Sequence, residues 1–89
     1  MEIKWTDVDP ESGGRRYVVA KRFGGKWSFK YKLHRREEWT PGLAPTRQMW
    51  EEVLDILRRR YVRRDGVHPE DIEEVERILR DLPVPRDIE

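Results

Sequence analysis

Basic residues gather between positions 15 and 36, and no Asp or Glu lies among them. They are Arg15, Arg16, Lys21, Arg22, Lys26, Lys30, Lys32, Arg35 and Arg36. Solvated protein surfaces usually mix both signs of charge, whereas a local excess of cations attracts a polyanion. The chemistry that this run could perform is therefore the binding of phosphate groups, as on a nucleic acid.

Within this run, residues 26–33 alternate between large apolar residues and mainly basic ones. Trp27, Phe29, Tyr31 and Leu33 take one parity, and Lys26, Lys30 and Lys32 take the other. Successive side chains of a strand point to opposite faces of a sheet, so the lysines share a face. The alternation alone favours the solvated side of a half-covered sheet. The absence of acids across the whole run is what favours a binding surface.

A second basic cluster, Arg58, Arg59, Arg60, Arg63 and Arg64, precedes an acidic segment. Cations near a helix C-terminus are stabilised by the helix dipole, and Asp55 can pair with Arg59, which explains part of the cluster without a ligand. From residue 65 to residue 89 there are nine acids against three arginines. We interpret the acidic segment as a solvated helix or as a partner for a basic surface.

Residues suited to catalysis or metal binding are scattered. His34 and His68 have no third ligand at a metal-binding spacing, and Ser12 and Ser28 lie in no nucleophile motif. There is no cysteine in the chain. We therefore expect no enzymatic activity, no metal site and no cofactor.

Composition sets the class of protein. The chain of 89 residues is 36% apolar and 42% charged, with four Trp, three Tyr and two Phe, and its net charge is +1. This predicts one small folded domain covering residues 1–89. No apolar run reaches the length of a membrane span. With no disulfides, a cytoplasmic protein is expected. The absence of Asn and the single Gln suggest a thermophile or a GC-rich source.

The pattern of elements predicts an α+β fold, in which a three-stranded antiparallel sheet (β-β-β) precedes two α-helices packed on one face. Strands are expected over about 2–8, 16–23 and 26–34, an ordered extended connection over 34–45, helices over about 46–65 and 69–82, and a short tail over 83–89. Thr46 is the expected cap of the first helix. His68 before Pro69 is the expected cap of the second.

The Gly24-Gly25 pair predicts a hairpin, but two registers remain open. A two-residue turn places Tyr17 and Val19 on the face of the lysines. A turn with one bulged residue reverses the parity and moves Tyr17 to the aromatic core face. Trp39, in the connection, also has two interpretations, either as part of the core or as a platform on which a base could stack.

These observations predict a small nucleic-acid-binding module without enzymatic activity. The expected contacts are Arg15, Arg16, Lys26, Lys30, Lys32, Arg35 and Arg36, extended by Arg58, Arg59 and Arg63. DNA and RNA are equally compatible with the pattern. The alternative is a protein-interaction or homodimerisation module, in which the basic sheet and the acidic helix are complementary across an interface.

Overall fold

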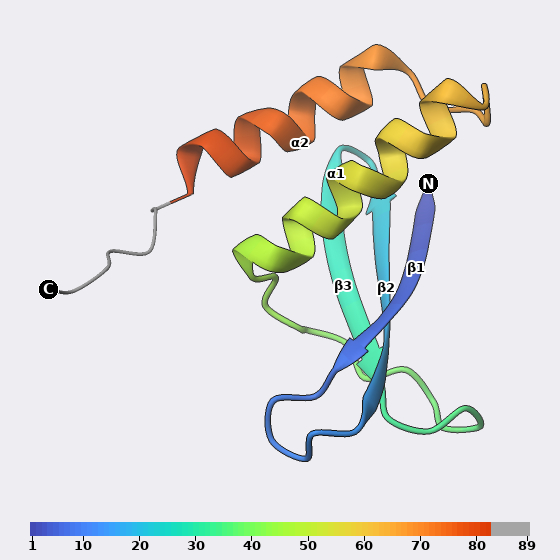
Figure 1. Cartoon of the computed structure of the whole chain (residues 1–89), viewed down its shortest axis with the longest axis vertical. Helices are drawn as coiled ribbons and strands as arrows, with labels where there is room; N and C mark the ends of the chain where they lie inside the picture. The colour runs from blue at the N-terminus through green and yellow to red at the C-terminus, as the bar shows by residue number, and fades with distance from the viewer. Residues whose placement is uncertain (83–89) are drawn as a thin grey trace, which may run out of the picture. The chain divides into compact units, whose positions relative to one another are not determined.

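The computed structural model describes residues 1–82 and has the predicted α+β order (Figure 1). The elements are β1 (Glu2–Val8), β2 (Arg15–Phe23), β3 (Lys26–Lys32), α1 (Arg47–Val62) and α2 (Pro69–Asp81). The predicted tail over 83–89 lies outside the described residues. The chain divides into two compact units at the boundary between Pro45 and Thr46. Each unit is described by itself, and packing of the helices on the sheet stays a prediction.

The first unit is built on an antiparallel sheet with strand order β1-β2-β3. Ile3 lies opposite Ala20, and Ala20 lies opposite Phe29, so these three share one face. All three are buried, as is Val18 beside them. Trp5 meets Phe29 edge to face, with ring centroids 6.3 Å apart. This face is the apolar side that the alternation of both outer strands predicts.

The β2–β3 hairpin has the two-residue turn. Gly24 and Gly25 both have positive φ, +59° and +78°, as a type I′ turn requires. Phe23 pairs directly with Lys26 across this turn. The bulged alternative is therefore wrong, and Tyr17 lies on the side of the sheet opposite to Phe29.

The connection after β3 begins with a turn over residues 33–37, although an extended segment is predicted from residue 34. Strand β3 ends at Lys32, before the predicted end at residue 34, and the Leu33 amide that follows donates to the Glu37 carboxylate at 2.8 Å. The chain then returns along the edge of β3. Tyr31 and Thr40 exchange backbone hydrogen bonds of 3.0 and 2.7 Å, and the Leu43 amide donates to the Phe29 carbonyl at 3.1 Å. This segment covers part of an edge that would otherwise expose backbone donors and acceptors.

The second unit contains the two helices. Thr46 caps α1 by accepting a hydrogen bond from the Met49 amide at 3.2 Å, as predicted. The buried face of α1 consists of Met49, Trp50, Val53, Leu54 and Leu57. Tyr61, which the same periodicity places on this stripe, is 45% exposed. The helix ends at Val62 rather than near residue 65, because Arg64 already has a left-handed φ of +58°.

Helix α2 begins where the sequence predicts. His68 is the N-cap and Pro69 the first helical residue. The Asp71 carboxylate accepts from the His68 amide at 3.0 Å, which satisfies a backbone donor at the helix start. Val75 and Leu79 form its buried stripe. Among residues 1–82, no helix has both the length and the apolar character needed to cross a membrane.

Candidate nucleic-acid interface

The face of the sheet opposite to Phe29 is called the lysine face. The strand register assigns it Glu2, Lys4, Thr6 and Val8 from β1, Arg15, Tyr17, Val19, Lys21 and Phe23 from β2, and Lys26, Ser28, Lys30 and Lys32 from β3. Five of these residues are lysines, and one is an arginine. Lys4 and Lys30 flank Val19 from the two sides, and Lys32 lies beside Tyr17. The face is therefore both basic and aromatic.

Glu2 is the one carboxylate that the strand register places on the lysine face within residues 1–82. It lies 3.5 Å from Lys4 and 3.6 Å from Lys21. Exposed pairs of this kind contribute roughly 0.2–1 kcal/mol, so they constrain the two lysines weakly. Lys26 and Lys30 make no ion pair with any carboxylate of residues 1–82. Most of the positive charge on this face is uncompensated.

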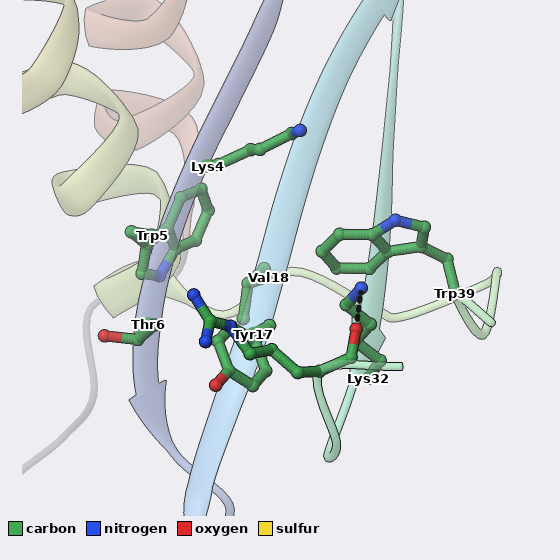
Figure 2. A pocket seen from close by; sticks show the side chains of 8 residues that line it. Lys4, Trp5, Thr6, Tyr17, Val18, Lys32 and Trp39 are labelled. Carbon is green, nitrogen blue, oxygen red and sulfur yellow. Dashed lines mark hydrogen bonds between the residues drawn. The ribbon is translucent and has the colours of Figure 1, made fainter. Parts of the chain in front are cut away.

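One end of the lysine face is hollowed (Figure 2). This hollow has a volume of about 500 Å³ and is called the Trp39 hollow. Its lining residues are Lys4, Trp5, Thr6, Tyr17, Val18, Lys32, Arg35 and Trp39. In Figure 2, Lys4 reaches over β2 from one side, Trp39 and Lys32 lie on the other, and Tyr17 lies between them. Three of the lining residues, Lys4, Lys32 and Arg35, are cations. No Asp or Glu of residues 1–82 lines the hollow.

The position of Trp39 follows from the edge pairing of its segment. Because Tyr31 pairs with Thr40, Trp39 comes next to Lys32 and projects to the lysine face. The Lys32 ammonium lies 4.6 Å from the centroid of the Trp39 ring, a cation–π geometry. The same ammonium donates to the Arg35 carbonyl oxygen at 2.8 Å (Figure 2). The interpretation of Trp39 as a core residue is therefore wrong.

Arg16 does not join the lysine face. It lies opposite Asp7 on the apolar side of the sheet and is 8% exposed. Its guanidinium donates two hydrogen bonds of 2.8 Å to the Asp7 carboxylate. These bonds raise the pKa of Arg16. Of the predicted contacts near the start of β2, only Arg15 faces solvent on the basic side.

Arg35 and Arg36 are exposed in the turn that follows β3. Arg35 lines the Trp39 hollow, and Arg36 does not. The turn also contains Glu37, whose carboxylate accepts from the Leu33 amide at 2.8 Å.

The predicted arginines of α1 belong to the second unit, and two of them are ion-paired there. Arg58 lies 2.8 Å from Glu76 of α2. Arg59 lies 2.8 Å from Asp55, the pairing that the sequence suggests, and 3.9 Å from Glu52. Arg63 is the exposed C-cap of α1. Local acids thus compensate much of the charge that this cluster has in the sequence.

The site contains residues that the predicted contact list omits. Lys4, Thr6 and Tyr17 line the Trp39 hollow, and Lys21 lies on the same face. The alternation Ile3-Lys4-Trp5-Thr6 could have indicated Lys4 and Thr6, because placing Ile3 and Trp5 on the apolar face turns their neighbours to the opposite one. The face on which Tyr17 lies depends on the length of the Gly24-Gly25 turn, and the sequence alone did not determine that length.

Comparisons of the chain with protein-family models, with curated proteins and with solved structures find no match. In the part of the chain that the structure describes, no three His, Cys, Asp or Glu residues are grouped so that they could hold a metal ion.

Proposed function

We propose that the protein binds nucleic acid through the lysine face and catalyses no reaction. The observation that carries this proposal is the charge of the face, on which the strand register places five lysines and Arg15 but, within residues 1–82, no carboxylate other than Glu2. A surface of this kind neutralises phosphates and releases their counterions. Binding should therefore be electrostatic in the main and should weaken steeply with salt.

The lysines of β3 supply the most direct phosphate contacts in this proposal. Lys30 and Lys32 are two residues apart on one strand, so their Cα atoms are separated by about 7 Å along it. Lys26 continues the row toward the hairpin tip. Lys4 stands across Val19 from Lys30 and widens the row into a patch. A phosphate chain lying on this patch would meet several cations at once.

A binding titration tests the proposal with a matched pair of double variants. Lys26→Glu with Lys30→Glu reverses two charges that have no ion-pair partner within residues 1–82. Arg77→Glu with Arg80→Glu makes the same change of charge on exposed positions of α2. We expect labelled DNA or RNA to bind the native chain at low salt, the first variant to lose binding, and the second to retain it.

Two results would contradict the proposal. One is the absence of any binding at low salt. The other is an equal loss in the two double variants, which would show that net charge matters and the lysine face does not.

The proposal includes the cellular location of the protein. We place the protein in the cytoplasm because the chain has no cysteine for disulfides.

Homodimerisation or binding of a protein partner is the alternative function. It is favoured by the exposed acids Glu70 and Glu73 of α2, which are complementary in charge to the lysine face. It predicts a dimer that dissociates as salt is raised, measured by sedimentation. A protein that stays monomeric at all salt concentrations would contradict homodimerisation.

A further inference from the structure

We infer that the Trp39 hollow holds one unstacked base of a single-stranded nucleic acid, while the lysines beside it bind the flanking phosphates. This inference rests on the proposed function and adds to it the class of nucleic acid and the place of a base. It depends on the aromatic residues of the hollow and not only on its charge.

Two aromatic side chains of the hollow can contact a planar ring. Tyr17 and Trp39 both line it, and both are partly exposed. Its volume of about 500 Å³ falls within the range of about 300–1,000 Å³ that small-molecule sites have. Bases stack on aromatic side chains whatever the sequence, because every base has a π face. The hollow thus offers a base aromatic side chains to stack on, which a flat basic surface lacks.

The charges around the hollow select the kind of ring that can enter. Lys4, Lys32 and Arg35 surround it, and no acid of residues 1–82 lines it. A cationic ligand would be repelled, so the hollow is not suited to an ammonium group or a basic peptide. A base whose nucleotide is flanked by phosphates on both sides fits, since Lys4 lines the hollow and Lys30 lies across Val19 from Lys4.

The Lys32 ammonium is held in place before any ligand arrives. One of its N–H groups donates to the Arg35 carbonyl at 2.8 Å, and the charge rests 4.6 Å from the Trp39 ring centroid. These contacts fix the cation and the indole relative to each other. A base that stacks at Trp39 therefore brings its phosphate close to this cation.

A duplex cannot use the hollow in this way. Its bases are stacked and paired, and only a base splayed out of a single strand can lie against a side chain. The duplex would be limited to phosphate contacts with the lysines. We therefore expect a single strand to bind more tightly than the duplex of the same sequence at the same salt.

The experiment compares single-stranded DNA and RNA with their duplexes, using native protein, Trp39→Leu and Trp39→Phe. Leu keeps apolar bulk but has no π face, whereas Phe keeps a stacking surface. We expect Trp39→Leu to weaken single-strand binding about tenfold or more and Trp39→Phe to retain most of it. The slope of log affinity against log salt should not change in Trp39→Leu, because no phosphate contact is lost.

A second measurement does not depend on the folding of the Leu variant. Stacking of a base on Trp39 should quench tryptophan fluorescence in the native protein, and this quenching should be smaller in Trp39→Phe, which keeps the other three tryptophans.

Three outcomes would overturn the inference. Salt-sensitive binding that treats single strand and duplex alike, with Trp39→Leu unaffected, would refute it and leave the proposed function standing. A mononucleotide bound as tightly as the strand would also refute it, because the flanking lysines would then contribute nothing. No binding of any nucleic acid at low salt would refute both proposals.

Discussion

Arg16 shows how the fold divides a run of basic residues between two roles. Its neighbour Arg15 faces solvent, whereas Arg16 lies on the other side of the sheet and donates two hydrogen bonds to the Asp7 carboxylate. A buried guanidinium needs such a partner, because an uncompensated charge in the interior is costly. Arg16 therefore belongs to the stability of the sheet and not to the binding surface.

We predict that Asp7→Ala lowers the free energy of unfolding by about 1.5–3 kcal/mol, the value of hydrogen bonds to a charged group. Affinity for nucleic acid should stay unchanged at a temperature where the variant is folded, since Asp7 is not on the lysine face. Urea unfolding and the binding titration check the two parts. A fall in affinity with unchanged stability would contradict this assignment.

At the scale of elements, the turn at Gly24-Gly25 fixes which residues share the lysine face. Both glycines adopt positive φ, which L-residues occupy at a cost of roughly 1–2 kcal/mol. The two-residue turn sets the pairing of β2 with β3 and thereby places Tyr17 beside Lys32. A change of one residue in its length would move every side chain of one strand to the opposite face.

We predict that Gly25→Ala destabilises the protein by about 1–2 kcal/mol, although a Cβ there would meet no atom within 4 Å. Gly14→Ala is the matched control, because Gly14 does not have positive φ and its Cβ would only touch the Ser12 hydroxyl at 3.5 Å. Urea unfolding of the two variants should separate them. Equal costs would contradict the conformational explanation.

Local patterns in the sequence were enough to predict the elements and their order. Alternation defined the strands, and the residues around Thr46 and Pro69 defined the helix starts. The site was only partly predictable. The lysine row on β3 followed from parity, but the place of Tyr17 required the turn length. The place of Trp39 required the pairing of Tyr31 with Thr40, which joins segments that no local pattern connects.

At the scale of the whole molecule, a net charge of +1 conceals a strong local imbalance. The lysine face lies in the first unit, while the arginines of α1 meet Asp55 and Glu76 within the second. Local potential, rather than the total charge, determines where a polyanion binds. The two basic clusters of the sequence are thus unequal as candidate surfaces.

The most direct test of nucleic-acid binding by the lysine face is an NMR titration of the ¹⁵N-labelled protein with a single-stranded oligonucleotide. We predict that backbone amides of Lys30 and Lys32 and the indole N–H of Trp39 shift with added strand, while amides of α2, such as Arg77, do not. Shifts centred on α1 and α2, or none at low salt, would contradict the proposed function.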